Sequence, residues 1–252
     1  MYYAAVLSGD RNLQSVFKSG GDFHSAIAKM VFNLPCEVGD VKEQFPVMRQ
    51  SAKAISFGIL YGSGPAKVQS TVQQALIDAK IDQIYTIDDA KNDINTYFTK
   101  FSKLRKWLNE RKDFIATNGF TYSFFGRKRR LPNVFSSDKG IAASEVRSGV
   151  NSEIQSVCSD VNLLGAMDTH DELARKGMKS KIFMLVHDSI VGLVAEDEEE
   201  AYCEILKRNT QKDRGCSIPG TPIGVDQEVG DDYSFGKWDK YYKFESSVLS
   251  RL

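Results

Sequence analysis

Apolar residues recur at helical spacing in several long segments of this 252-residue chain, and this periodicity limits what it can fold into. Apolar side chains at every third or fourth position form one helix face, which must be buried against another element. With 42% hydrophobic residues the chain can bury a substantial core, as one large domain or two smaller ones. The pattern predicts five helical segments: 11–32 with a break at Gly20-Gly21, about 47–61, 88–117 with a bend near Phe101-Ser102, 140–170 and 196–209.

Short segments are typical of strands. Residues 120–125 alternate and are rich in aromatics, they follow the turn signal Asn118-Gly119, and a basic loop over 126–130 is expected after them. Apolar residues 181–186 and 190–194 predict a β-hairpin with polar groups at its bend. The chain is therefore expected to combine long helices with at least one hairpin.

Charge is distributed unevenly along the chain. Lys plus Arg and Asp plus Glu each total 33, so the formal net charge is zero, which argues against a uniformly basic nucleic-acid binder. From Lys100 to Arg130, however, ten basic residues face two acidic ones, whereas acid is concentrated in 196–200 and 226–239. A basic middle and an acidic C-terminal third suggest that one face binds a polyanion. The alternative is a set of solvated helix faces beside a loop.

Neither a membrane partner nor a disulfide framework is expected. No run of about 18 apolar residues occurs, and the first residues lack a signal-peptide pattern. The cysteines form no CxxC pair, which disfavours a zinc site and favours a reducing cytoplasm.

Arg49, Lys53, Phe57 and Tyr61 follow one another at four-residue intervals. On a helix this spacing places them on one slowly drifting face. Two cations followed by two aromatic rings can hold a polyphosphate at one end and stack a base at the other. Gly62 would let another group approach the helix closely. The alternative is an amphipathic helix with two solvated cations.

Asp188 stands between His187 and Ser189 at the bend of the predicted hairpin. A carboxylate flanked by apolar strands needs a compensating partner, and a metal ion is one candidate. The alternative is an Asp that makes only a turn hydrogen bond.

Arg147, Asn151 and Gln155 also fall on one helix face. Their donors and acceptors suit base edges and sugars, and minor-groove contacts of this kind sense base-pair shape without sequence preference. The alternative is an ordinary polar helix face.

Several sequence segments resemble motifs of one family and occur in the same order as in that family. RQSAKAISFGILYG (Arg49–Gly62) looks like motif B of family A DNA polymerases, the group that contains bacterial DNA polymerase I and several tailed-phage replicases. VHDSI around Asp188 resembles motif C, and RSGVNSEIQSVCSD resembles the stretch between them. AAVLSGD, Asp22-Phe23-His24 and GRKRRLPN are similar to further family segments, so the resemblance spans nearly the whole chain and is closest to phage enzymes.

The resemblance implies roles around the incoming dNTP. His24, Arg49 and Lys53 would bind its phosphates, and Lys53 would also protonate the leaving pyrophosphate. Phe57 would pack against the sugar, and Tyr61 would lie by the templating base.

It also implies contacts with primer-template DNA and with two Mg²⁺ ions. Gly62 would let the template pass, Asp188 would ligate the catalytic metals, and His187 would lie near the primer terminus. Arg147, Asn151 and Gln155 would line the minor groove at the primer end. Arg127, Arg129 and Arg130 would contact phosphates.

Two departures from the family pattern matter. Ser189 replaces the Glu that usually follows the motif C Asp, but Asp188 is kept, so this change is not taken as inactivating. Alignment of AAVLSGD places motif A, with the other metal-binding Asp and the Glu that discriminates against ribonucleotides, immediately before Met1. Two-metal phosphoryl transfer needs carboxylates for both ions, so the isolated chain is expected to be inactive.

The implied fold is α+β: a palm on a small antiparallel sheet, with an inserted all-helical fingers subdomain and without thumb or exonuclease. Residues 1–23 and 119–252 would form the palm, and residues 24–118 the fingers. The N-terminal palm strand would be incomplete and would leave a sheet edge open to a partner strand.

These features favour the C-terminal part of a split phage DNA polymerase acting in the bacterial host cytoplasm. Its N-terminal partner chain would carry motif A and the thumb, with or without an exonuclease. The alternatives are a truncated fragment and a degenerate, non-catalytic nucleic-acid-binding module. Single-subunit RNA polymerases share a related motif B but have Met-Thr where this chain has Phe57-Gly58. The Phe57-Gly58 pair therefore favours deoxynucleotides as substrates.

Overall fold

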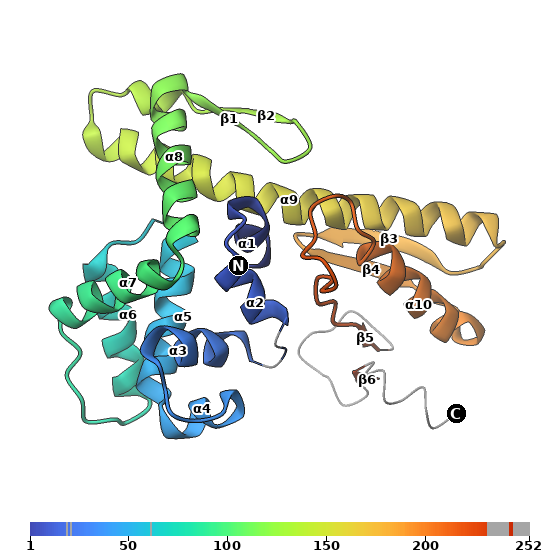
Figure 1. The fold of residues 1–252 in the computed structure, drawn as a ribbon. Coiled ribbons are helices and arrows are strands. Elements are labelled where there is room, and N and C mark those ends of the chain that lie inside the picture. Colours follow the sequence, from blue (N-terminus) through green and yellow to red (C-terminus); the bar gives the residue numbers. More distant parts are fainter. Residues whose placement is uncertain (19, 21, 61, 231–241, 244–252) are drawn as a thin grey trace. The chain divides into compact units, whose positions relative to one another are not determined.

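The structure, a computed structural model, describes residues 1–252 except 19, 21, 61, 231–241 and 244–252 (Figure 1). It divides into two compact units, one of residues 1–158 with 216–221 and the other of residues 159–215 with 222–252. In the described part helices dominate, and the strands form three two-stranded antiparallel sheets. This composition agrees with the predicted α+β class.

The first unit is built mainly of helices. Helices α3, α5, α6 and α7 pack on one another, and Ile27, Ile55 and Tyr97 are fully buried in this unit. Its elements are α1 (Tyr2–Ser8), α2 (Arg11–Lys18), α3 (Phe23–Phe32), α4 (Val41–Gln44), α5 (Pro46–Leu60), α6 (Pro65–Asp78), α7 (Ile87–Lys100), α8 (Ser102–Asn118), β1 (Phe120–Tyr122), β2 (Lys128–Arg130) and the first part of α9 (Lys139–Arg175).

The predicted helical segment 88–117 is present as α7 and α8, and the bend expected near Phe101-Ser102 is confirmed. The two helices are separate because Phe101 leaves the helical region with φ −112° and ψ 57°. A second predicted element differs from the structure. The predicted strand 120–125 ends at Tyr122, and the predicted basic loop contains β2, which pairs with β1. The chain reverses between them because the Ser123 N–H donates to the Arg127 carbonyl at 2.9 Å.

The prediction of a partial N-terminal strand is wrong. Tyr2–Ser8 form α1, whose first four residues are all buried, a pattern that suits a packed helix better than a half-exposed strand. Gly9 ends the helix with a φ of 61°. The Tyr2 hydroxyl donates to the Thr221 carbonyl at 2.6 Å and accepts the Ile218 N–H at 2.9 Å, so α1 is anchored to residues 216–221.

Asp10 connects two helices of the first unit. Its carboxylate is buried, and Oδ1 accepts the N–H groups of Asn12 and Leu13, each at 3.1 Å, in the first turn of α2. Oδ2 accepts the N–H of Leu104 at 3.0 Å in the first turn of α8. Because helix N-termini leave N–H groups without intrahelical partners, one carboxylate satisfies donors of both helices and fixes α8 against α2.

The second unit holds the predicted hairpin. It contains the rest of α9, β3 (Lys181–Val186), β4 (Ser189–Leu193), α10 (Glu199–Thr210), β5 (Glu228–Val229) and β6 (Tyr242–Lys243). Leu173, Tyr202 and Ile205 belong to its core. Gly192 lets β4 pass close to Tyr202, since a Cβ at Gly192 would lie 2.6 Å from the Tyr202 ring carbon Cζ.

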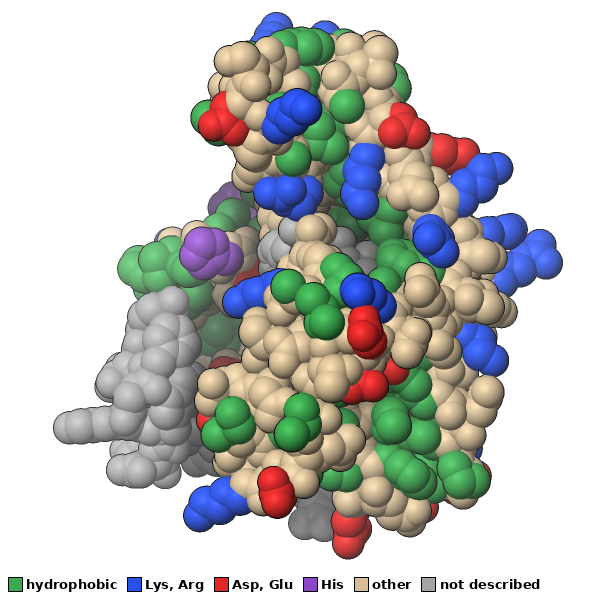
Figure 2. Space-filling model, turned by 90° about the vertical axis from the view of Figure 1, so that its left-hand side faces the viewer, with side chains coloured by type: hydrophobic (Ala, Val, Ile, Leu, Met, Phe, Trp, Pro, Cys, Tyr) green, Lys and Arg blue, Asp and Glu red, His purple; other side chains and the backbone are tan. Residues whose placement is uncertain are grey.

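The charged segment of the sequence is exposed on the surface. Lys103, Arg105 and Lys106 of α8 and residues 127–130 around β2 are all exposed. Lys and Arg side chains gather over the upper part of the face shown in Figure 2. Within the described residues, no helix is long and apolar enough to cross a membrane.

Candidate nucleotide site and nucleic-acid interface

Helix α5 presents three predicted site residues on one face. Arg49 and Lys53 are half-buried, and Phe57 is 44% exposed. Ala52 and Ile55, between them in sequence, are fully buried. The four-residue spacing therefore places these three side chains on one accessible face of α5, because the opposite face of the helix is buried in the core.

Asp22 joins this face to the start of α3. Its Oδ2 accepts the Ser25 N–H at 2.9 Å and caps the helix. The Arg49 guanidinium donates from Nε to Oδ2 at 2.8 Å and from Nη2 to Oδ1 at 3.2 Å. This two-point ion pair orients Arg49 and holds the pKa of Asp22 well below its usual range. Asp22 was not among the predicted site residues, although a helix-capping Asp two positions before His24 is a readable signal.

His24, in the first turn of α3, faces the aromatic end of the α5 face. Its ring centroid lies 5.4 Å from that of Phe57. Burial lowers the pKa of His24, and the positive charges of Arg49 and Lys53 lower it further, against the opposing effect of Asp22. His24 is thus held toward its neutral form, and its Nδ1 is buried without a hydrogen-bond partner among the described residues.

The structure therefore brings together four of the five predicted nucleotide-binding residues. His24, Arg49 and Phe57 are linked by the contacts above, and the charge of Lys53 acts on His24. The fifth, Tyr61, lies outside the described residues. Cations and an aromatic ring around a neutral imidazole can bind an anionic, ring-bearing ligand.

Gly62 meets Arg147, another predicted DNA-binding residue. Gly62 has a φ of 64°, and a Cβ there would lie 2.6 Å from Cγ of Arg147. The close approach that the glycine allows is thus made by the aliphatic part of the Arg147 side chain. The end of α5 and α9 are consequently in contact through this pair.

Three predicted residues follow one another along α9. Arg147 and Asn151 are half-buried, and Gln155 is exposed. The neighbouring β-hairpin is tied to the same helix, because Arg129 donates from Nη2 to the Ser148 hydroxyl at 2.9 Å. Arg127 and Arg130 are exposed on the hairpin, which this hydrogen bond holds beside α9.

His187 and Asp188 form the bend of the β3–β4 hairpin in the second unit. Val186 pairs with Ser189, so the bend has two residues, and His187 adopts a φ of 54°. That region is uncommon for residues other than glycine, and a strained backbone at such a bend is often tied to function. Both side chains are exposed.

The donor set around Asp188 fits a metal site only in part. A carboxylate is a proper ligand for Mg²⁺. Within the described residues, however, no group of three or more His, Cys, Asp or Glu side chains lies close enough together to hold a metal ion. The described chain therefore offers one carboxylate and not a complete site.

The family model and the similar proteins are all DNA polymerases. The sequence model described as DNA polymerase family A matches residues 1–235. The chain is 53% identical over 260 aligned residues to the DNA polymerase of Escherichia phage T5, covering 96% of this chain and 30% of the phage protein. It is 28% identical over 233 residues to the thermostable DNA polymerase I of Thermus aquaticus, covering 92% of this chain and 26% of that protein.

A solved structure gives the same result for the fold. The POL domain of Pol1 from M. smegmatis, in complex with DNA primer-template and dNTP, matches with a TM-score of 0.69 and 26% identity over 83% of this chain and 34% of that one. The chain thus spans about a third or less of the length of these relatives.

Proposed function

The chain belongs to DNA polymerase family A, and on that premise we propose that it is the palm-and-fingers part of a template-directed DNA polymerase. In this proposal it adds dNTPs to a primer 3′-OH on a DNA template. The arrangement of α3 and α5 carries the proposal, because His24, Arg49 and Phe57 come from two helices into one site with Lys53 beside them.

The incoming triphosphate would bind to the cationic part of this site. Arg49 uses two N–H groups on Asp22, and its remaining N–H groups can reach phosphate oxygens without losing that orientation. Lys53 would supply a compact charge and a proton for the leaving pyrophosphate. The arriving anion would raise the pKa of His24, so this imidazole would gain a proton as the site fills. Phe57 would pack against the sugar.

Primer-template DNA would lie on the other predicted surface of the first unit. Arg147, Asn151 and Gln155 would face the minor groove, where base-independent acceptors are present on every pair. The exposed arginines of the β1–β2 hairpin would neutralise phosphates. Gly62 would keep Arg147 seated against the end of α5.

The metal ions would be shared with a segment that supplies a second carboxylate. Asp188 would hold Mg²⁺ from this chain, with His187 near the primer terminus. Once bound, the ions would activate the 3′-oxygen and neutralise charge on the pyrophosphate. Phe183, Leu185 and Leu193 expose apolar side chains on β3 and β4, which supports a further segment packing on this hairpin. We assign that role to an N-terminal polymerase chain with motif A and the thumb.

Lys53→Ala tests the nucleotide site in the enzyme reconstituted with that N-terminal chain. We expect incorporation to fall about 100-fold or more, because both a phosphate contact and a proton donor are lost. Primer-template affinity should change less than about threefold, since the proposed DNA surface is untouched. Lys67→Ala, which removes an exposed cation of α6, is the matched control. Equal losses of incorporation and DNA affinity in Lys53→Ala would contradict the proposal.

DNA binding without any partner-dependent synthesis would favour the non-catalytic alternative. Single-turnover incorporation and primer-template binding, measured on the same preparation, separate the two functions.

A further inference from the structure

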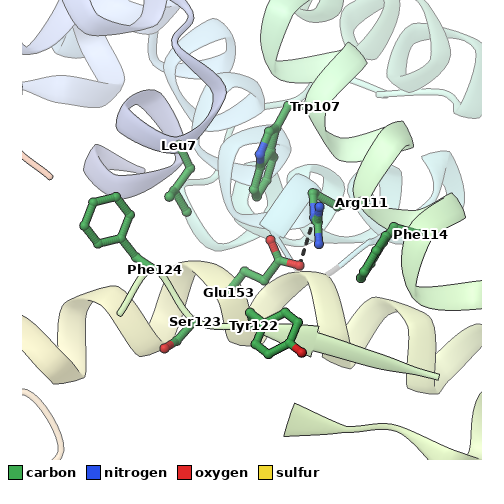
Figure 3. A pocket seen from close by; sticks show the side chains of 8 residues that line it. All are labelled: Leu7, Trp107, Arg111, Phe114, Tyr122, Ser123, Phe124 and Glu153. Atoms are coloured by element: carbon green, nitrogen blue, oxygen red, sulfur yellow. Dashed lines mark hydrogen bonds and ion pairs between the residues drawn. The ribbon is translucent and has the colours of Figure 1, made fainter. Parts of the chain in front are cut away.

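A cavity of about 300 Å³ lies in the first unit, away from the nucleotide site of α3 and α5. It is formed where α1, α8 and α9 meet the end of β1 and the residues that follow it (Figure 3). Four aromatic side chains line it, namely Trp107, Phe114, Tyr122 and Phe124. The remaining lining residues are the aliphatic Leu7 and the polar Arg111, Ser123 and Glu153.

The polar part of the lining is internally neutralised. Arg111 donates from Nε to Oε1 of Glu153 at 3.0 Å, and the Thr121 hydroxyl also bonds to that oxygen. The Arg111 guanidinium carbon lies 4.5 Å from the ring centroid of Phe114. Because the charges of the pair cancel, the cavity itself has no net attraction for an anion. It offers flat apolar walls with a few hydrogen-bonding groups.

Glu153 retains an acceptor that faces this space. Its side chain is 9% exposed, and among the described residues the recorded donors reach Oε1 rather than Oε2. Figure 3 shows the carboxylate of Glu153 below Trp107, with one oxygen joined to Arg111 and the other pointing toward the Trp107 ring. A carboxylate oxygen in an aromatic pocket suits the exocyclic amine of a nucleobase.

Cations lie beside one edge of the cavity. Tyr122 and Phe124, which line it, are 47% and 44% exposed, and the exposed basic run 127–130 begins shortly after Phe124 in sequence. Lys128 pairs with Tyr122 across the β1–β2 hairpin, and its Nζ lies 5.9 Å from the Tyr122 ring centroid. Exposed aromatic rings interleaved with cations are typical of surfaces that stack bases and track the phosphates of a single strand.

We propose that this cavity binds an unpaired nucleobase of single-stranded DNA, with the adjoining phosphates on the basic run 127–130. A duplex cannot use it, because paired bases are stacked and expose no ring face to a side pocket. The inference rests on the proposed function only in taking DNA as the polyanion, and it adds a contact for unpaired DNA to the proposed duplex surface.

Trp107 provides a direct readout in the full chain. Trp238, the other tryptophan, lies outside the described residues and can be replaced as Trp238→Phe to leave one emitter. A single-stranded oligodeoxynucleotide of about 12 nucleotides should quench Trp107 fluorescence in a saturable way. A hairpin duplex of equal charge should bind without that quenching. Equal quenching by both DNAs, or none by either, would overturn the proposal.

Substitution of Phe124 separates stacking from charge. Phe124→Ala and Phe124→Leu should each weaken single-strand binding about 10-fold and leave its salt dependence unchanged, because a stacking face and no cation is lost. Arg130→Ala should instead reduce the slope of log affinity against log salt by about 1. Phe135→Ala, an exposed phenylalanine outside the cavity, is the matched control. Unchanged single-strand affinity in folded Phe124→Leu, checked by circular dichroism, would reject the site.

These outcomes are independent of polymerisation. Quenching by single strands without synthesis in the reconstituted enzyme would keep the cavity assignment and reject the proposed function. DNA synthesis by the reconstituted enzyme, together with unchanged single-strand binding in Phe124→Leu, would keep the proposed function and reject the cavity assignment. Competition by a protein segment in place of DNA, with no DNA binding, would also reject the assignment.

Discussion

At the scale of single residues, the candidate nucleotide site depends on Asp22 as much as on the cations of α5. Asp22 caps α3 and orients Arg49, so it sets the relative position of the two helices' functional side chains. The sequence indicated the cations by their spacing but not the carboxylate that holds one of them. The reason is physical: an ion pair between residues 22 and 49 depends on how two helices pack, which periodicity does not determine.

Asp22 variants separate the cap from the ion pair. Asn is as good an N-cap as Asp, so Asp22→Asn should lose only the ion pair and cost less than about 1 kcal/mol at pH 7, because the Asp22 side chain is 44% exposed. Asp22→Ala should cost about 1 kcal/mol more. The folded-state pKa of Asp22 lies below its ordinary 3.8, so the ion-pair stabilisation is complete above that pH and is lost as pH falls further.

Urea unfolding at pH 7 and in mild acid checks this expectation. The difference between the wild-type protein and Asp22→Asn should shrink below about pH 4. Glu37→Gln, which breaks the Lys29 pair of an 87% exposed carboxylate, should be nearly neutral throughout. A cost of Asp22→Asn that does not change with pH would show that the ion pair is not its source.

The pKa of His24 should respond in opposite directions to its two kinds of neighbour. Lys53→Met removes a positive charge and should raise this pKa, whereas Asp22→Asn removes a negative charge and should lower it further. NMR titration of the imidazole protons measures both. His170, exposed on α9, gives a reference imidazole signal in the same spectra. An unchanged His24 pKa in Lys53→Met would show that Lys53 is not close enough to His24 to belong to the site.

At the scale of elements, helix ends fix how the helices of the first unit meet. Asp10 satisfies donors of both α2 and α8, whereas Thr86 caps α7 alone through a capping box with Asp89. Asp10→Ala should therefore cost about 2 kcal/mol or more, and Thr86→Ala about 1 kcal/mol. Urea unfolding compares the two variants. A smaller loss of unfolding free energy in Asp10→Ala than in Thr86→Ala would mean that the cap shared by α2 and α8 does not stabilise the protein.

Elements with a clear apolar pattern were predictable, including the short strands β3 and β4, and elements without one were missed. The predicted helix at about 47–61 is α5 at Pro46–Leu60, and that at 140–170 lies within α9. Helix α6 was missed, because the glycines and proline at 62–65 indicated an end without showing that a new helix begins at Pro65. Strand β2 was missed because its three side chains are all exposed cations, so its pairing comes from the turn and not from an apolar pattern.

At the scale of the whole molecule, the described chain divides its chemistry between two units. The first holds the candidate nucleotide site and the side chains proposed to contact DNA, and the second holds the Asp188 hairpin. Family membership was readable from motif order, and it implied which residues matter. It did not imply the partners that those residues use within the fold, such as Arg147 against Gly62.

Primer extension tests the central claim most directly. The full chain is incubated with primed DNA, Mg²⁺ and all four dNTPs, alone and with an N-terminal polymerase chain that carries motif A. A version of that chain with the motif A Asp changed to Ala, and Asp188→Ala in this chain, are the matched controls. We expect extension only with the intact pair and a loss of about 100-fold or more in either control, since each removes a metal-binding carboxylate. Robust extension by this chain alone would contradict the account.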